Sequence, residues 1–219
     1  MKAINKSLEL ATAYKSWIEK LDNENKLHPP YNSSTNEYYY DIVANLLWVQ
    51  QGLCAYTEMY LIDKDKVNPK LWKNGRFNRF QFLGQLDHYD ASLKEQKAWD
   101  WNNFFMIHSD VNTKHKRSKS VNYLLKPDKG NFSPFYFLDY DVVTHFFIPN
   151  VNRDQEMITK IQEDIFSLGL NFEPISDYRR IYLKPIFEEI ELGICTVDVA
   201  RQKLNKFYTA FEMAITQFS

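Results

Sequence analysis

Apolar residues recur at helical spacing near both ends of the chain. This spacing predicts an amphipathic helix over residues 2–21, and residues 38–52 predict a second helix that ends at Gly52. The apolar positions of the first helix are Ile4, Leu8, Ala11, Trp17, Ile18 and Leu21. The last third of the chain is helical again and predicts three helices, over residues 155–170, 176–193 and 197–218.

The middle of the chain has a looser, β-rich pattern. It predicts strands or hairpins over residues 53–63, 79–90 and 135–150. Residues 100–119 predict a strand or turn that enters a short helix near Ser109 or Asp110, and either residue is a candidate cap. Helices, a small β-rich middle and further helices together indicate an α+β fold, with a predominantly helical shell.

Composition and charge restrict the class of protein. The 219 residues fit one ordinary domain, or one domain with a long appendage. The net charge is −1, so any site for a polyanion must be a local patch. The two cysteines lie far apart, which indicates a reducing compartment. Without a signal peptide or a run of about 20 apolar residues, the sequence predicts a cytoplasmic protein with no membrane partner.

A set of polar residues in the middle of the chain carries candidate chemistry. Asp87 and His88 are adjacent, and Asn103, Asn112 and His115 follow. A neutral imidazole can deprotonate water, and carboxylate and amide oxygens are the ligands that Mg²⁺ prefers. A basic cluster suited to a phosphate backbone surrounds Asn112: Lys114, Lys116, Arg117 and Lys119. These residue types favour phosphodiester hydrolysis, although spacing alone leaves open a chance Asp-His pair on a surface.

A second basic stretch lies upstream of this set. It contains Lys64, Lys66, Lys70, Lys73, Arg76 and Arg79. The sequence leaves two interpretations of this stretch open, namely a guide for nucleic acid and a contact for an acidic partner.

The segment "LDHYD…DWNNFFMIHSDVN…H" resembles the motif of the HNH, or ββα-metal, endonucleases. The upstream segment "CAYTE" is similar to the "CAYCE" entry of the HNH group that includes the PtuB-type nucleases of Septu and retron-associated anti-phage systems. The resemblance covers roughly residues 42 to 145. It implies a small ββα-metal core within a helical shell, with a helical segment over 1–52, the nuclease core over 53–150 and a second helical segment over 151–219.

The resemblance also implies a role for each matching residue. His88 corresponds to the general base, and Asp87 and Asn112 correspond to ligands of Mg²⁺ or Mn²⁺. Asn103 corresponds to the Asn that orients the His-bearing loop. His115 falls where many relatives carry Lys and would contact the metal, the phosphate or neither. The implied protein is an endonuclease of a bacterial defence complex, working on nucleic acid with an ATPase partner of the PtuA type.

The chain departs from the family where relatives bind a structural zinc through two Cys-x-x-Cys pairs. The corresponding positions hold Cys54 with Thr57, and His108 with Val111. Because zinc needs four suitable ligands, we expect no structural zinc, and we expect Cys54 to be a small buried side chain. This loss keeps a second hypothesis open, a degenerate HNH scaffold that serves only as an interaction subunit. The motif also does not choose between DNA and RNA, for example tRNA.

Overall fold

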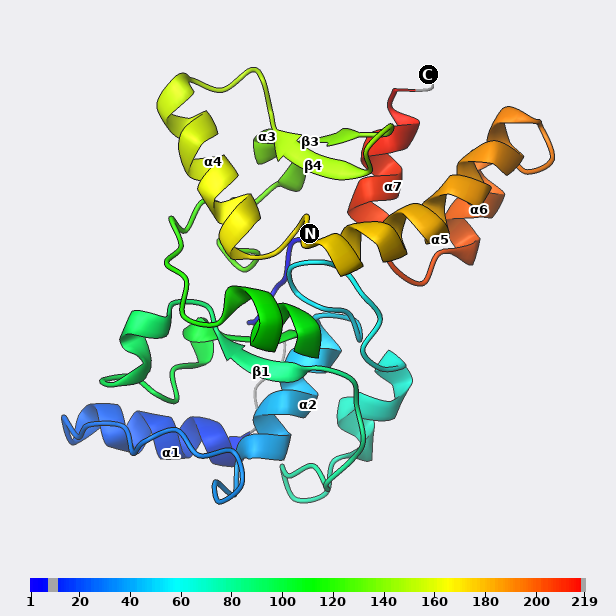
Figure 1. Cartoon of the computed structure of the whole chain (residues 1–219). Coiled ribbons are helices and arrows are strands. Elements are labelled where there is room, and N and C mark those ends of the chain that lie inside the picture. The colour runs from blue at the N-terminus through cyan, green and yellow to red at the C-terminus, as the bar shows by residue number, and fades with distance from the viewer. Residues whose placement is uncertain (8–11, 218–219) are drawn as a thin grey trace. The chain divides into compact units, whose positions relative to one another are not determined.

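The computed structural model describes residues 1–7 and 12–217 and has an α+β architecture with two small antiparallel sheets (Figure 1). The chain forms two compact units. Unit 1 comprises Met1–Ala3, Tyr56–Met59 and Val121–Ser219, and unit 2 comprises Ile4–Ala55 and Tyr60–Ser120. This division differs from the expected segments because residues 121–150 belong with the C-terminal helices. None of the helices in the described ranges combines the length and apolar character that a membrane crossing needs.

Unit 2 is built on a β-hairpin followed by a short helix. Strand β1 (Gln85–His88) pairs antiparallel with β2 (Phe104–Ile107), and His88 lies opposite Phe104. The chain then enters a π-helical segment, η5 (Val111–Lys116), which Figure 1 shows as the green helix lying over β1. Strand β2 is entirely buried, so it forms the centre of the core of this unit.

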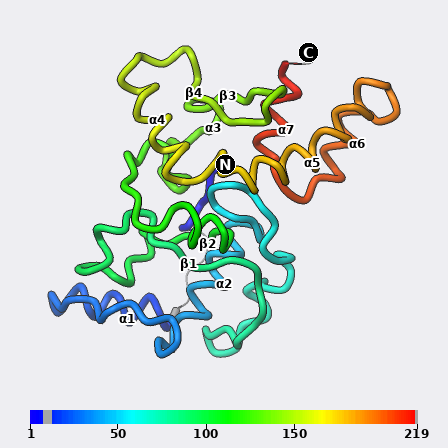
Figure 2. The backbone as a smooth tube through the Cα atoms, viewed as in Figure 1, coloured from blue at the N-terminus to red at the C-terminus, as the bar shows by residue number. Residues whose placement is uncertain are grey.

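Two longer helices complete unit 2. They are α1 (Thr12–Asn23) and α2 (Tyr39–Val49), and α2 lies beside β2 (Figure 2). Gln50, just after α2, donates to the Met106 carbonyl at 2.8 Å and accepts from its N–H at 2.9 Å. Gly52 turns the chain with φ +75°, where a Cβ atom would lie 2.0 Å from the Ile62 carbonyl oxygen. Only glycine tolerates this approach, which confirms the predicted end of the second helix.

Short 3₁₀ segments occupy the loops of unit 2. They are η1 (Lys64–Val67), η2 (Pro69–Leu71), η3 (Ala91–Lys94) and η4 (Trp101–Asn103). Asp63, Asn68, Asp90 and Asp100 cap them by accepting backbone N–H groups through their side chains. These caps explain how a long polar stretch keeps a defined path without a regular strand.

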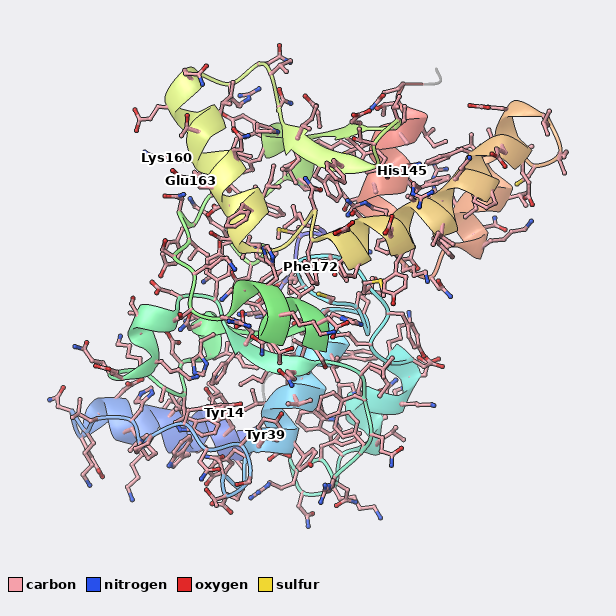
Figure 3. All side chains as sticks on the ribbon, in the orientation of Figure 1. Tyr14, Tyr39, His145, Lys160, Glu163 and Phe172 are labelled. Carbon is pink, nitrogen blue, oxygen red and sulfur yellow. The ribbon has the colours of Figure 1, made fainter. Side chains whose placement is uncertain are left out.

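Unit 1 packs a second hairpin among helices. Its elements are α3 (Pro134–Phe137), β3 (Leu138–Asp141), β4 (Phe146–Pro149), α4 (Gln155–Ser167), α5 (Glu173–Glu191), α6 (Val197–Lys203) and α7 (Tyr208–Ile215). Figure 3 labels His145 at the hairpin end, where its ring stacks on Phe187 of α5 with centroids 6.4 Å apart. The fully buried Arg179 of α5 donates to the His145 carbonyl at 2.7 and 3.0 Å, so a charged side chain fixes the hairpin turn. The predicted β segment over 135–150 and the helices over 155–170 and 176–193 are confirmed.

The first predicted helix is shorter than expected. Residues 1–5 are extended, α1 begins at Thr12, and the expected apolar positions Leu8 and Ala11 lie outside the described residues. Lys6 explains why the chain is not helical there: its buried ammonium lies 3.6 Å from the centre of the Phe105 ring and 3.1 Å from the Trp101 carbonyl oxygen. Tertiary contacts thus override the local periodicity.

Two β predictions in the middle of the chain are largely wrong. Residues 53–63 contain only an isolated bridge between Leu53 and Tyr60, because Glu58 adopts a left-handed conformation (φ +58°) that interrupts an extended strand. In the stretch 79–90 only Gln85–His88 forms a strand.

The last predicted helix is two helices. The chain breaks between α6 and α7, where Phe207 is buried and left-handed, with φ +57°. Glu58 accounts for the break because its carboxylate accepts the backbone N–H of Thr209 at 2.9 Å and also binds the Thr209 hydroxyl. The buried glutamate thus caps the start of α7 from a distant part of the sequence.

Candidate active site

His88 ends β1 and is held in one orientation. Its Nε2 lies 2.8 Å from the Ala98 carbonyl oxygen. A carbonyl only accepts hydrogen bonds, so Nε2 carries the proton and Nδ1 carries the lone pair. Tyr31 and Phe104 contact the imidazole edge-on, each with ring centroids 4.9 Å away. The ring is therefore a fixed base that presents Nδ1.

Burial lowers the pKa of His88 from 6.5 to about 4, and the positive charges of Lys94 and Lys116 lower it further, against the hydrogen bond to Ala98. The imidazole is therefore neutral near pH 7, the protonation state that a general base requires. A base of such low pKa is weak, however. An anion bound near the imidazole would raise this pKa, because it would offset the two lysine charges.

Asn103 holds the loop that follows His88. Its Oδ1 accepts the backbone N–H of Asp90 at 2.8 Å, and its Nδ2 donates to the Asp90 carbonyl at 2.9 Å. The backbone of Asn103 also accepts the N–H of Tyr89 at 2.7 Å. These three bonds fix the chain on the C-terminal side of His88. Asn103 is 3 % exposed, so it acts on the loop from the interior.

Asp87 is paired with a buried lysine. The ammonium of Lys116 lies 3.0 Å from Asp87 Oδ2 and 3.3 Å from Oδ1, and it donates to the His88 carbonyl at 2.9 Å. Lys116 is fully buried and Asp87 is 5 % exposed. The expectation that Lys116 belongs to a phosphate-contacting surface is therefore wrong, because its side chain points into the interior toward Asp87.

Asn112 lies in the first turn of η5. Its Nδ2 donates to Gln85 Oε1 at 3.0 Å, which fixes the amide so that its carbonyl oxygen is the other end. The N–H of Arg117 reaches back to the Asn112 carbonyl at 3.0 Å, the i to i+5 bond of a π-helix. The wide turn places Lys116, four residues after Asn112, on the side of the helix that faces β1.

The remaining residues of the basic cluster differ in their surroundings. Lys114 pairs with Asp110 at 2.9 Å, so the Asp110 side chain does not cap the helix as expected. Lys119 donates to the His115 carbonyl, and the half-buried His115 side chain does not line the pocket beside His88. Arg117 is exposed, and its guanidinium donates to the Thr113 carbonyl at 2.9 Å.

An open pocket of about 420 Å³ collects the central residues of the site. It is lined by Tyr31, Leu86, Asp87, His88, Ala91, Lys94, Asn112, Arg117 and Ser118. The structure thus brings together Asp87, His88 and Asn112, and it adds two exposed cations, Lys94 and Arg117. A neutral base beside two cations can bind an anion and deprotonate a water molecule next to it.

The residues as arranged do not fit a divalent cation. Both oxygens of Asp87 lie within 3.3 Å of the Lys116 ammonium, so a metal ion there would lie beside a buried positive charge. Asn112 adds only one amide oxygen. Among the described residues, no group of three or more His, Cys, Asp or Glu is arranged to hold a metal.

The residues at the former zinc positions have other roles. Cys54 is buried, and its Sγ accepts the backbone N–H of His108 at 3.3 Å. His108 Nδ1 accepts the N–H of Asp110 at 3.3 Å, and Val111 is fully buried. Thr57 belongs to unit 1. Cys54 is thus buried as expected, and the expectation of no structural zinc stays a prediction.

Sequence reasoning missed three contributors to this site. Tyr31 comes from a polar loop, and Lys94 comes from the exposed segment between the strands. The Ala98 carbonyl is a backbone group and leaves no signal in the sequence. A weak signal existed for Tyr31, because a lone aromatic residue beside a Pro pair indicates an anchored loop.

No family model matches the chain, and no curated protein is significantly similar to it in sequence.

Proposed function

We propose that this chain is an HNH-type endonuclease that hydrolyses phosphodiester bonds in nucleic acid. The observation that carries the proposal is the fixed, neutral His88 at the end of β1, with Nδ1 as its basic nitrogen, in a pocket shared with Lys94 and Arg117. The order of strand, strand and short helix in unit 2 supports the proposal, as does the motif resemblance.

His88 has the role of general base in this proposal. Its Nδ1 accepts a proton from a water molecule, whose oxygen attacks phosphorus as the ester P–O bond breaks. Solvent returns a proton to the leaving oxygen. The Ala98 carbonyl stabilises the resulting imidazolium by accepting from Nε2. Asn103 keeps the following loop in place, so it is a positioning residue.

Lys94 and Arg117 have the role of phosphate ligands. Both are exposed, and both line the pocket with His88. A phosphodiester between them would bring negative charge close to His88. That charge would raise the imidazole pKa toward neutrality and make it a stronger base only when substrate is bound.

The Mg²⁺ or Mn²⁺ that the resemblance implies is tested directly, because the Asp87–Lys116 pair opposes a cation at this position. The expected ATPase partner and the defence role are proposals from the resemblance alone.

One observation favours a second candidate, a non-catalytic scaffold. Lys116 satisfies Asp87 completely within the interior, as a structural ion pair would. Under this interpretation the hairpin and η5 persist only as a folding core, and His88 is a packed aromatic neighbour of Tyr31.

The test is cleavage of plasmid DNA and of total tRNA by the purified chain, with EDTA, Mg²⁺ or Mn²⁺, and with or without an ATPase partner. The key variant is His88→Gln, whose amide can still donate to the Ala98 carbonyl but cannot take a proton. We expect loss of cleavage by at least about a hundredfold. His115→Gln serves as the control on the same hairpin–helix element, outside the pocket.

Equal cleavage by wild type and His88→Gln would overturn the proposed base. Absence of cleavage under every condition, with normal folding of the wild type, would establish the scaffold. Comparison of the EDTA and metal reactions decides whether a cation is required.

A further inference from the structure

Unit 2 carries a second, larger concave surface with a distinctive composition. An open pocket of about 780 Å³ lies between α2, the loop over residues 60–62, η1 and the segment over residues 79–83. This volume falls within the range of about 300–1,000 Å³ that is typical of ligand sites. We name it the aromatic groove and define it by Tyr40, Tyr60, Lys66, Arg79, Phe80 and Phe82.

The rings of the groove form a connected series. The centroid of Phe80 lies 6.1 Å from that of Tyr40 and 5.2 Å from that of Phe82. Tyr60 is 40 % exposed, although the next two residues, Leu61 and Ile62, are buried. A large ring exposed next to a buried pair presents an apolar face to whatever enters the groove.

The charge of the groove is one-sided. None of the residues that line it in the described structure is acidic, whereas Lys66 and Arg79 are both exposed there. Within the described part of the chain neither cation has a carboxylate partner. The neighbouring Arg76 contrasts with them, because Asp41 holds it at 2.9 Å and Glu37 at 3.4 Å. The guanidinium of Arg79 lies 6.0 Å from the Tyr40 ring centre, so charge and ring are adjacent.

The groove wall has a fixed backbone. The N–H of Leu83 donates to the Leu61 carbonyl at 2.9 Å, which joins the two sides of the groove. Gly84 then passes the Ile107 carbonyl so closely that a Cβ atom would lie 2.5 Å from its oxygen. The segment that supplies Phe80 and Phe82 therefore leads directly into β1, the strand that ends at His88.

We propose that the aromatic groove binds single-stranded nucleic acid. Unpaired cations attract the phosphates, and exposed rings stack on bases, which only an unpaired strand can offer. An acidic protein segment would use the cations but would gain little from several rings in series. The proposal concerns binding and stands apart from the proposed cleavage at His88, so each can fail alone.

The test measures binding of fluorescent oligothymidylate, about 20 nucleotides long, to the full chain in EDTA, in both the wild-type and His88→Gln backgrounds. We expect Tyr60→Leu, which keeps apolar bulk but removes the ring, to weaken binding roughly tenfold. We expect the double variant Lys66→Gln, Arg79→Gln to lower the slope of log K against log salt by about one. Lys20→Gln on α1 is the matched control, and it should bind as wild type does.

Two further probes separate the occupants. A duplex of the same length should bind more weakly than the single strand, and a poly-glutamate peptide should compete poorly. Equal binding of duplex, effective competition by the peptide, or unchanged binding by the Tyr60 and Lys66/Arg79 variants would each overturn the proposal. Binding that survives in a chain without any cleavage would uphold the groove and refute only the proposed endonuclease.

Discussion

The ammonium of Lys116 lies 3.0 Å from a carboxylate oxygen of Asp87, and both side chains are buried beneath η5. Removing water from two charges costs several kcal/mol per ion, so the pair stabilises the fold only while both partners are present. The pair also joins the helix to β1, the strand that carries His88. Stability, cation binding and the position of His88 are therefore linked through one contact.

Replacing Lys116 with Met should lower the free energy of unfolding by about 3–5 kcal/mol, because Asp87 would remain buried and unpaired. The measurement is urea denaturation. In the double variant Lys116→Met, Asp87→Asn, part of this loss should be recovered. A loss below about 0.5 kcal/mol for the single variant would show that the pair has no structural weight.

The same pair predicts how the chain responds to metal ions. In Lys116→Gln the carboxylate of Asp87 is freed, so Mn²⁺ should raise the melting temperature of this variant more than that of the wild type. The control is Lys116→Gln, Asp87→Asn, which should not respond. A large Mn²⁺ shift in the wild type would show that Lys116 yields to the metal and that the expected cofactor binds after all.

The low pKa of His88 predicts a pH dependence of stability. Its value falls from 6.5 in the unfolded chain to about 4 in the folded one. Between these values the unfolded chain binds a proton that the folded chain does not, so the free energy of unfolding rises with pH across this window, by about 3 kcal/mol. His88→Gln should remove this part of the slope, measured as the difference from wild type.

NMR titration gives the same pKa directly. Lys94→Gln should raise the pKa of His88, because the Lys94 charge lowers it, and the exposed Lys97→Gln serves as the control. A His88 pKa near 6.5 in the wild type would contradict the burial of this ring.

Asn103 tests the loop that follows His88. Asn103→Ala removes both side-chain bonds to the Asp90 backbone and should cost about 1–3 kcal/mol of stability, with loss of any cleavage activity. Asn103→Asp keeps the acceptor for the Asp90 N–H but loses the donor, so it should fall between wild type and Asn103→Ala. Denaturation and cleavage assays on the same samples distinguish a positioning role from a purely structural one, which would leave the activity of the folded fraction intact.

The sequence pattern predicts elements whose stability is local. Helix α2, the β3–β4 hairpin and helices α4 and α5 follow from periodicity and end signals, and Asp87, His88 and Asn112 do meet at one pocket. The pattern fails where distant contacts decide the backbone. The break at Phe207 depends on Glu58, whose carboxylate caps α7 across 151 positions of sequence.

Lys116 illustrates the same limit within the site. A lysine in a run of basic residues ordinarily extends into solvent, so its sequence context predicts an exposed side chain. Its burial depends on the π-helical turn of η5 and on a carboxylate 29 positions away, neither of which the local pattern contains.

The discontinuity of unit 1 has a practical consequence for anyone who dissects this protein. Residues 1–3, 56–59 and 121–219 belong to one unit, with the two stretches of unit 2 inserted between them. Any single truncation point therefore removes part of unit 1, including one that follows Ser120 and leaves unit 2 whole. A C-terminal fragment that begins at Val121 would lack Glu58, and with it the cap of α7. Point substitutions in the full-length chain are consequently a safer route to assigning functions than deletion mapping.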